Sequence, residues 1–315
     1  MVNPSTTRAN FIAAVAVTLL LAACSSAAST ASQSASPLPA AADYMAIVVA
    51  SEFVVGEDRF PFGLVSMDGN LLENAQVRVR FSYLKPDSDE LRGEAPARFL
   101  EIKGVTPHQH AGGEVHEHLE LRSVYVAHGV KFDTPGFWRA EFLARTATGQ
   151  QVSVGSAAFE VKTESSVPYI GELVPPSRNL TLADVDSIEE IETRVPPDGM
   201  HELSVAQALE QGKPFVVVFA TPMFCVTRMC GPVTDIAAAL HERYSKQVNF
   251  IHIEPWDLKI ARSEGRLVPI DVALEWNLPT EPWVFVVDKE GKVASRFEGL
   301  VSSEELENAI TAVLP

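Results

Sequence analysis

The stretch that most constrains this chain runs from residue 215 to residue 232, where a short apolar segment is followed by two cysteines and a Gly-Pro pair. The segment 215–220 reads FVVVFA, and β-branched and aromatic residues of this kind favour a buried strand. Cys225 and Cys230 come next, and Pro232 suits an early helical position. Thiols between a strand and a helix N-terminus are favoured as thiolates. The stretch therefore predicts a dithiol/disulfide couple.

The spacing of the two cysteines limits where the helix can begin. Residues five apart in a helix are separated by about 7.5 Å along the axis and turned by about 140°, whereas a disulfide needs Cα atoms within about 7 Å. We therefore expect the helix to start at Gly231 or Pro232, after both cysteines. On this expectation Cys230 lies nearest the helix N-terminus and has the lowered pKa, with Arg228 stabilising a thiolate. A purely structural disulfide is the alternative, although so small a ring gains little loop-closure entropy.

Composition sets broad limits on class and partners. The chain has 315 residues, of which 46% are hydrophobic, as in globular domains. Its formal net charge is −16, which makes nucleic acid and anionic membrane surfaces poor partners. We therefore expect no nucleic-acid binding.

The first 43 residues are typical of an exported, tethered protein. Residues 1–23 are expected to be a lipoprotein signal peptide, because Arg8 precedes the apolar run Phe11–Ala23, which is too short to span a bilayer. This run leads into Cys24 through Leu-Ala-Ala, which resembles a bacterial lipobox and implies that Cys24 carries lipid. An ordinary signal peptide that contains a cysteine is the alternative.

The Ser-, Ala- and Pro-rich residues 24–43 would then be a flexible tether. The expected location is the cell membrane, with the lipid bilayer as a partner and the protein on its extracytoplasmic face. Lipidation of Cys24 leaves Cys225 and Cys230 as a pair in a compartment where disulfides persist.

Residues 44–163 are predicted to form an all-β domain. Apolar and charged residues alternate in the segment 77–81, VRVRF, as in a strand with one buried face. About seven short strands with turn signals between them suggest an immunoglobulin-like sandwich. The candidate strands are Met45–Val55, Pro61–Met67, Gln76–Leu84, Arg98–Val105, Leu119–His128, Trp138–Ala144 and Val152–Lys162.

One loop of this region is rich in histidine. His108, His110, His116 and His118 surround a Gly-Gly pair, and His-x-His places two imidazoles on one side of an extended segment. Two such pairs could converge on one metal ion, with copper, zinc or nickel as the candidates. The alternative is a solvated polar loop that binds metal only in vitro.

Residues 164–200 are predicted to be a linker or an extended arm that packs on the last domain, with a short helix between Leu180 and Ile191. From residue 201 the pattern alternates helices and strands. Ser204 with Gln207 forms a capping box, and Ser302 with Glu305 forms another. The expected strands are Phe215–Ala220, Val248–Ile253, Trp283–Val287 and Val293–Phe297, and a short helix is expected at Asp271–Asn277.

This order of elements, with a dithiol loop after the first strand and Leu278-Pro-Thr-Glu281-Pro282-Trp283 before the hairpin, resembles the thioredoxin fold over residues 201–315. The predicted fold class is thus an α/β thioredoxin-like domain preceded by an all-β immunoglobulin-like sandwich. The resemblance implies that Pro282 is a cis-proline facing the thiols, and that Pro282 and Trp283 line a groove for the substrate.

The resemblance is at the level of the superfamily, because Cys-x4-Cys replaces the Cys-Gly-Pro-Cys of thioredoxin. Peroxiredoxins of the Q type share this spacing, but Pro222 stands where they have threonine. Sco-type copper chaperones use Cys-x3-Cys and also match imperfectly. The acid that thioredoxin carries on its core strand is missing from residues 215–220, so His252 and Glu254 are the candidates for proton transfer.

The favoured hypothesis is a membrane-anchored, extracytoplasmic thiol–disulfide oxidoreductase, with Cys225 and Cys230 catalytic and protein thiols or disulfides as its partners. It requires no cofactor. One alternative is a copper-binding or metallochaperone-type protein that uses the dithiol, the histidine loop or both, with copper or zinc as the ion. Another is a thioredoxin-like lipoprotein that binds partners without catalysis.

Overall fold

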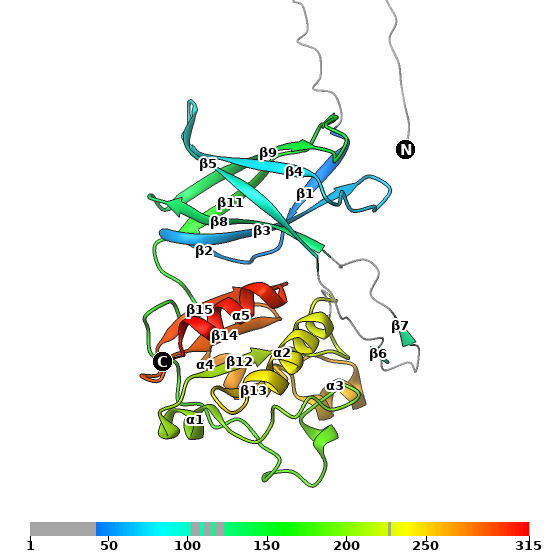
Figure 1. The fold of residues 1–315 in the computed structure, drawn as a ribbon, viewed down its shortest axis with the longest axis vertical. Helices are drawn as coiled ribbons and strands as arrows, with labels where there is room; N and C mark the ends of the chain where they lie inside the picture. Colours follow the sequence, from blue (N-terminus) through cyan, green and yellow to red (C-terminus); the bar gives the residue numbers. More distant parts are fainter. Residues whose placement is uncertain (1–41, 102–107, 110–114, 117–122, 226–227, 315) are drawn as a thin grey trace, which may run out of the picture. The chain divides into compact units, whose positions relative to one another are not determined.

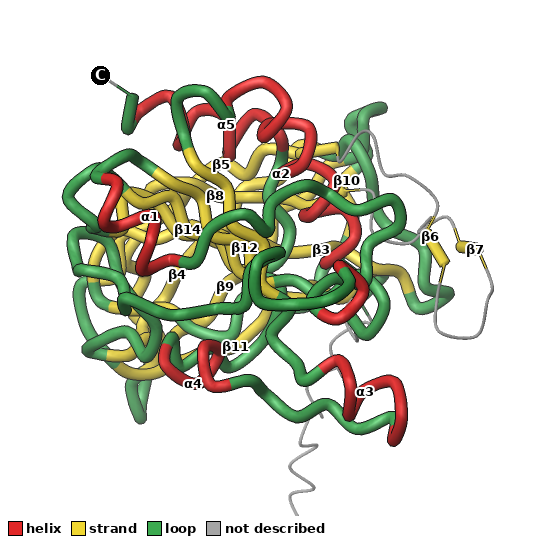
Figure 2. The backbone as a smooth tube through the Cα atoms, turned by 90° about the horizontal axis from the view of Figure 1, so that it is seen from below, coloured by secondary structure: helices red, strands yellow, loops and turns green. Residues whose placement is uncertain are grey.

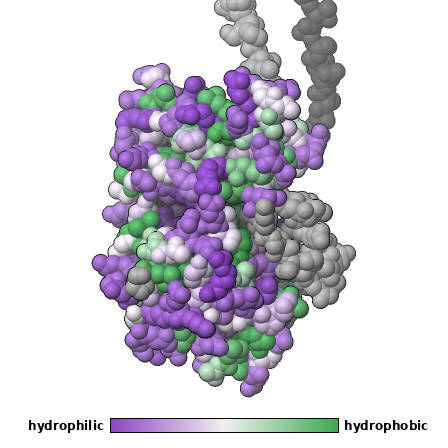
Figure 3. Space-filling model, viewed as in Figure 1, coloured by the Kyte–Doolittle hydropathy of each residue, from purple (hydrophilic) through white to green (hydrophobic). Residues whose placement is uncertain are grey.

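The computed structural model describes residues 42–101, 108–109, 115–116, 123–225 and 228–314, and these described residues belong to one compact unit (Figure 1). The predicted domain boundaries at 163 and 200 stay a prediction. Among the described residues, none of the helices combines the length and the apolar character needed to cross a membrane. The face drawn in Figure 3 is mostly hydrophilic, with smaller hydrophobic areas between polar ones.

The described part of the segment 44–162 is built from strands, as predicted. The strands are β1 (Tyr44–Val48), β2 (Phe53–Val54), β3 (Gly56–Ser66), β4 (Gln76–Leu84), β5 (Asp89–Glu101), β6 (His108–Gln109), β7 (Val115–His116), β8 (Ser123–Phe132), β9 (Gly136–Arg145), β10 (Gln151–Val152) and β11 (Ala157–Lys162). The alternation in β4 has the predicted effect, because Val77 and Val79 are buried while Arg78 and Arg80 are exposed. The inward side chains meet an aromatic core that includes Phe60, Phe62, Phe81, Phe132 and Trp138.

The strands of this region are hydrogen-bonded as one sheet of nine, in the order β1-β3-β8-β5-β4-β9-β11-β2, with β10 beside β9. An immunoglobulin-like sandwich would instead have two sheets. The N–H of Tyr44 donates to the carbonyl of Ser153 at 3.1 Å, and the N–H of Gly155 donates to that of Tyr44 at 2.9 Å. The β1 edge thus meets the chain that leads into β11, which covers an edge that would otherwise be open. The β-rich character is confirmed, and the two-sheet arrangement is not.

The segment 201–314 contains the predicted alternation. Its elements are α1 (Val205–Gln211), β12 (Phe215–Phe219), α2 (Cys230–Tyr244), β13 (Asn249–Ile253), α3 (Leu258–Glu264), α4 (Asp271–Glu275), β14 (Trp283–Val287), β15 (Val293–Glu298) and α5 (Ser303–Ala312). The sheet order is β13-β12-β14-β15, in which β12 and β13 are parallel and the other pairs antiparallel. Both capping boxes are present, and α1 ends at the predicted Gly212, which has a φ of 61°. Helix α3 was not predicted.

Both faces of this four-stranded sheet are covered, because alternate residues of β12 point to opposite sides. Val216 and Val218 pack with apolar residues of α2 and α5, whereas Phe215, Val217 and Phe219 pack with residues of α1 and α4. Figure 2 shows α2 and α5 on one side of β12 and β14, and α4 on the other. Sandwiching the central strand in this way fixes the position of the loop that follows it.

The predicted start of α2 was wrong by one or two residues, because the helix begins at Cys230. Pro232 still lies in the first turn, where its missing N–H has no intrahelical partner to lose. Cys225 alone precedes the helix, so the two cysteines are still not joined by continuous helix, as a disulfide between them requires.

The arm before α1 has little regular structure, as predicted. The expected helix between Leu180 and Ile191 is reduced to a single turn of 3-10 helix, η2 (Ile188–Glu190). Val167 and Val174 pack into the same cluster as β12 and α1, and Leu173 forms an isolated bridge with Lys292 of the hairpin. The arm is therefore part of the packed structure around the C-terminal sheet.

Candidate functional site

The dithiol lies at the junction of β12 and α2, where the buried central strand gives way to the helix. Cys230 is fully buried, whereas Cys225 is partly exposed. The backbone N–H of Cys230 donates to Sγ of Cys225 at 3.3 Å. Cys225 thus receives a donor from the first turn of a 15-residue helix, which is the environment that stabilises a thiolate.

The environment of Cys230 is the opposite of the predicted one. Burial raises the pKa of its thiol well above the usual value, and the neighbouring Cys225 adds to the effect, while a backbone hydrogen bond from Thr221 lowers it. The expectation that Cys230 has the lowered pKa was therefore wrong. Cys230 is the thiol nearer the helix N-terminus along the chain, but closeness in sequence does not show which thiol is packed under the helix and excluded from water.

A carboxyl group completes the dithiol site. The two sulfur atoms and a carboxylate oxygen of Glu281 all lie within 4.8 Å of one another, and Glu281 is 8% exposed. Glu281 was not among the predicted site residues, although its position directly before the proline expected to face the thiols was an available signal. It places a carboxyl group beside both thiols, whereas the predicted candidates were His252 and Glu254.

The predicted proline has the expected isomer, because the Glu281–Pro282 peptide is cis. Trp283 is 1% exposed and stacks on Phe285, with 5.6 Å between ring centroids, so most of its indole belongs to the core. It also lines a small cavity of about 30 Å³ together with Arg296 and Glu298. Its part in a substrate groove stays a prediction. Arg228 is exposed and has a left-handed backbone with a φ of 61°. Its role in stabilising a thiolate stays a prediction.

The two residues proposed for proton transfer, His252 in β13 and Glu254 just after it, have other partners. Nε2 of His252 donates to the carbonyl of Ala220 at 3.0 Å, and its Nδ1 lies 2.6 Å from Asp198. Burial lowers the pKa of His252, but the charge and hydrogen bond of Asp198 outweigh burial and raise it to about 9.

Glu254, the other candidate, directly follows β13 and accepts the N–H of Thr193 at 2.8 Å. Burial raises the pKa of Glu254. The hydroxyl of Thr193 also accepts the N–H of Met223 at 3.1 Å, so Glu254 is linked to the cysteine loop through Thr193. His252 and Glu254 are therefore hydrogen-bonded to the segment that carries the cysteines, His252 directly at Ala220 and Glu254 through Thr193 at Met223. Glu281 is the carboxyl group beside the thiols.

Two other predicted sites lie outside the described residues, wholly or in part. Cys24, His110 and His118 are not described, and of the histidine loop the structure gives the backbone pairing of β6 with β7, which sets His108 opposite His116. Metal binding by this loop stays a prediction.

Alkylation of the folded protein checks the assignment of the two thiols. We expect iodoacetamide to modify Cys225 at least about tenfold faster than Cys230. Cys225 is partly exposed and accepts an N–H from the first turn of the helix, which makes it the better nucleophile, whereas the buried Cys230 is protonated. Peptide mapping by mass spectrometry after timed quenching separates both sites from Cys24. In denaturant the two rates should become similar. Faster modification of Cys230 in the native protein would contradict the assignment.

No family model and no curated protein matches this chain. Among solved structures it is similar to a thiol:disulfide interchange protein of the thioredoxin family from Chlorobium tepidum, with 14% identity and a TM-score of 0.30, over 48% of this chain and 99% of that one. It is also similar to a thio-disulfide isomerase from Thermus thermophilus, with 27% identity and a TM-score of 0.23, over 32% of this chain and 79% of that one. Each of these two similarities covers less than half of the chain.

Proposed function

We propose that this protein is a thiol–disulfide oxidoreductase in which Cys225 is the nucleophile, Cys230 the resolving thiol and Glu281 the proton acceptor. The segment 201–315 would be its thioredoxin-like domain. The observation that carries the proposal is the meeting of the two sulfur atoms and the Glu281 carboxylate within 4.8 Å, with the N–H of Cys230 donating to Cys225.

The first chemical step is attack of the Cys225 thiolate on one sulfur of a substrate disulfide. A bond forms between Cys225 Sγ and that sulfur, the substrate's S–S bond breaks, and the other substrate sulfur leaves as a thiolate. The N–H of Cys230 stabilises the attacking thiolate before this step. Partial exposure of Cys225 allows the substrate to reach it.

In the second step the Cys230 thiol transfers its proton to Glu281 and attacks Sγ of Cys225. A Cys225–Cys230 disulfide forms, and the second substrate sulfur leaves as a thiolate, which is protonated from Glu281 or water. Two electrons have then passed from the protein to the substrate disulfide. The proton of Cys230 reaches one leaving sulfur through Glu281 or water, and the other leaving thiolate takes its proton from water. Because the sulfur atoms already lie within 4.8 Å, small side-chain rotations can bring them to the bonding distance of about 2.05 Å. An external dithiol donor must restore the reduced state.

Reduction of insulin by the full chain tests this function. We expect catalytic amounts to accelerate insulin reduction by dithiothreitol, and equilibration with glutathione to show a two-electron couple at Cys225 and Cys230. A rate equal to that of dithiothreitol alone, for a chain whose two thiols are reduced, would contradict the proposal. It would favour a thioredoxin-like protein that binds partners without turnover.

The role of Glu281 gives a separate prediction. Glu281→Gln should slow disulfide reduction by about tenfold or more, because a general base beside a transferred proton typically contributes more than that. The slowed step should be the second one, so mixed disulfide should persist longer in quenched samples, and raising the pH should partly restore the rate. Glu290→Gln is the matched control, since Glu290 is exposed on the hairpin turn. Equal rates for both variants would remove Glu281 from the mechanism.

A second candidate function is metal handling at the same site. Cys225, Cys230 and Glu281 offer two sulfur donors and one oxygen donor, and thiolates select soft ions such as Cu(I). Anaerobic dialysis of the reduced protein against copper tests this. Binding that survives in Cys225→Ser would show that the copper sits elsewhere.

We also propose that the protein is anchored through Cys24 on the extracytoplasmic side of the cell membrane. The support is the lipobox-like sequence that ends at Cys24, the polar tether behind it, and a pair of cysteines suited to an oxidising compartment. Metabolic labelling with a fatty acid, lost in Cys24→Ala, checks this proposal.

A further inference from the structure

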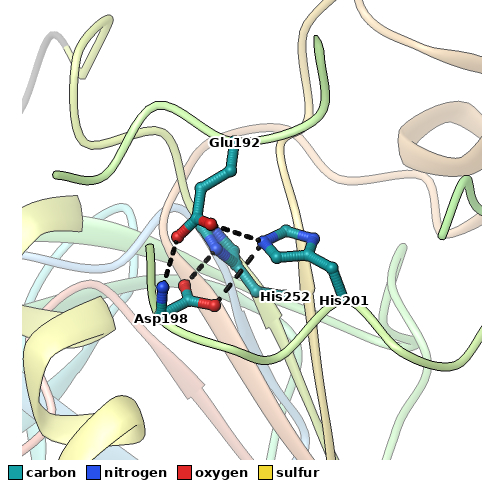
Figure 4. Close-up of side chains that lie close together, drawn as sticks. All are labelled: Glu192, Asp198, His201 and His252. Atoms are coloured by element: carbon teal, nitrogen blue, oxygen red, sulfur yellow. Dashed lines mark hydrogen bonds and ion pairs between the residues drawn. The ribbon is translucent and has the colours of Figure 1, made fainter. Parts of the chain in front are cut away.

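A second cluster of metal-binding side chains lies beside the dithiol loop and takes no part in the mechanism above. Glu192 and Asp198 come from the arm, His201 from the short segment between the arm and α1, and His252 from β13 (Figure 4). All four residues are buried, and their candidate donor atoms lie within 4.8 Å of one another. We propose that these four side chains form a binding site for a divalent transition metal ion, and that zinc is the ion they suit best.

Hydrogen bonds from backbone N–H groups orient the carboxylates of the cluster. Oε1 of Glu192 accepts the backbone N–H of Asp198 at 2.8 Å, which leaves Oε2 facing the other three side chains. Oδ1 of Asp198 accepts the N–H of Met200 at 2.8 Å. Metal-ligating carboxylates are held in this way by partners behind them.

The imidazole of His252 has the arrangement of a metal ligand. Its Nε2 donates to the carbonyl of Ala220, so its Nδ1 is the nitrogen that faces the cluster. A metal-bound histidine usually donates its other ring N–H to a carbonyl or carboxylate, which fixes the tautomer and the ring plane. Since Ala220 directly follows β12, at the start of the cysteine loop, this bond also connects the cluster to the dithiol site.

Two atoms that face the cluster lack a hydrogen-bond partner within the described residues. They are Oε2 of Glu192 and Nε2 of His201, and both are buried. His201 Nε2 lies 3.5 Å from Glu192 Oε2 and 3.5 Å from Asp198 Oδ1, which is too long for a hydrogen bond. Two ligand atoms of a tetrahedral zinc with bonds of about 2.0–2.2 Å lie about 3.3–3.6 Å apart, so these separations suit an ion between them.

One contact must change when an ion binds. Nδ1 of His252 and Oδ2 of Asp198 are 2.6 Å apart, which is the distance of a direct hydrogen bond, and an ion would separate them. A proton shared by these two atoms is therefore the competing state. That state satisfies His252 and leaves the atoms of Glu192 and His201 without partners, whereas an ion would engage all four side chains.

Charge and ligand type select the ion. Two carboxylates balance a divalent cation, so the filled site is neutral, and a buried site needs such compensation. Two imidazole nitrogens with carboxylate oxygens are a ligand set suited to zinc and other late divalent ions, and less to magnesium or calcium, which prefer oxygen alone.

A cavity gives an ion a path to the cluster. It has a volume of about 590 Å³ and is lined by His201 and His252, together with Glu254 and Trp256. The bound ion would connect the arm to β13. Through the hydrogen bond from His252 to Ala220 it would also stabilise the position of the cysteine loop. The proposal does not depend on oxidoreductase activity, because its evidence lies in the cluster itself.

The test measures zinc in a full chain that lacks the other candidate sites. In this background chain the four loop histidines (His108, His110, His116 and His118) are replaced by glutamine, and Cys225 by serine. After chelator treatment, isothermal titration with zinc chloride should show about one equivalent bound with micromolar or tighter affinity. Absence of binding at millimolar zinc in a folded background chain would overturn the proposal.

Two variants in that background locate the ion. Glu192→Gln and His201→Gln should each weaken zinc binding about a hundredfold or more, because even the loss of an outer-shell partner costs about 10–100-fold. Glu202→Gln is the control, since Glu202 is exposed next to His201. Unchanged affinity in both variants would overturn the proposal. If either variant fails to fold by circular dichroism, X-ray absorption of the zinc-loaded background chain decides, because two imidazoles and no sulfur are expected and any sulfur ligand would contradict the site.

Discussion

Replacing Cys225 with serine is expected to lower the rate of protein-disulfide reduction by about a hundredfold or more, because loss of the nucleophile removes the covalent step altogether. Cys225 is the thiol that substrate can reach, and the N–H of Cys230 already donates to its sulfur. The buried Cys230, whose pKa is raised by burial, cannot take over the attack on a protein substrate. Insulin reduction with equal amounts of wild type and variant measures the loss.

Cys230→Ser should fail in a different way. The first attack by Cys225 is retained, but the thiol that would resolve the intermediate is gone, so a mixed disulfide between Cys225 and the substrate should accumulate. Intact-mass spectrometry under non-reducing conditions detects it. The reversed pattern, with accumulation in Cys225→Ser and none in Cys230→Ser, would exchange the two roles. Full activity in both variants would rule out the dithiol mechanism.

A second large effect is expected at Glu52, which forms a buried ion pair with Arg296. Nη1 of Arg296 donates to Oε1 of Glu52 at 3.0 Å, and the two side chains are 7% and 1% exposed. The N–H and hydroxyl of Ser166 also donate to Glu52, at 3.0 and 2.7 Å. This pair joins the β-rich segment to strand β15. Removing one partner leaves an uncompensated buried charge, which typically costs about 3–5 kcal/mol.

Glu52→Gln should therefore lower the free energy of unfolding by about 3 kcal/mol, the lower end of that range, because Asp58 also acts electrostatically on Arg296. Urea unfolding followed by tryptophan fluorescence measures the change. The matched control is Arg98→Ala, which breaks the exposed pair of Arg98 with Glu304 and should cost about 0–1 kcal/mol. Equal losses in the free energy of unfolding would show that the buried pair contributes no more to stability than the exposed pair.

The pH dependence of this difference provides a further check. Burial raises the pKa of Glu52, but hydrogen bonds from Ser165, Ser166 and Arg296 outweigh burial and lower it to about 2 from 4.5. A lowered folded-state pKa means that the stabilisation is present above pH 4.5 and is lost as the pH falls toward 2. The difference in stability between wild type and Glu52→Gln should therefore shrink over that interval. A difference that stays constant from pH 5 to pH 2 would contradict the assignment.

The pKa of Asp58, which lies close to the same pair, is shifted in the opposite direction to that of Glu52. Burial raises its pKa to about 6 from 3.8, so its contribution to stability is fully present below pH 3.8 and is lost as the pH rises through 6. In the wild type the two groups therefore act in opposite directions as the medium becomes acidic. Comparing wild type with a variant that lacks Glu52 separates them.

Local patterns in the sequence were sufficient to predict most of the C-terminal elements. The apolar run 215–220 is the central strand, and the capping residues Ser204 and Ser302 begin helices as expected. These signals are short-range, since a cap or a strand run depends on neighbours within a few residues. The β-rich character of residues 44–162 was predictable for the same reason. The joining of its strands into one sheet was not, because alternation shows which face is buried but not which strand lies beside which.

The sequence by itself therefore determined that two thiols follow a buried strand, that a helix begins close to the second of them, and that Pro282 stands before the hairpin. The cis isomer of Pro282 was implied by the resemblance to the thioredoxin fold. Only the tertiary structure decided which thiol is buried, because that depends on how α2 packs over β12. It also decided that Glu281 lies beside Cys225 and Cys230 although it is distant from both in the sequence, and that His252 meets Asp198 across 54 residues of chain. These contacts depend on long-range packing of β12, β13 and β14, for which the local sequence carries no signal.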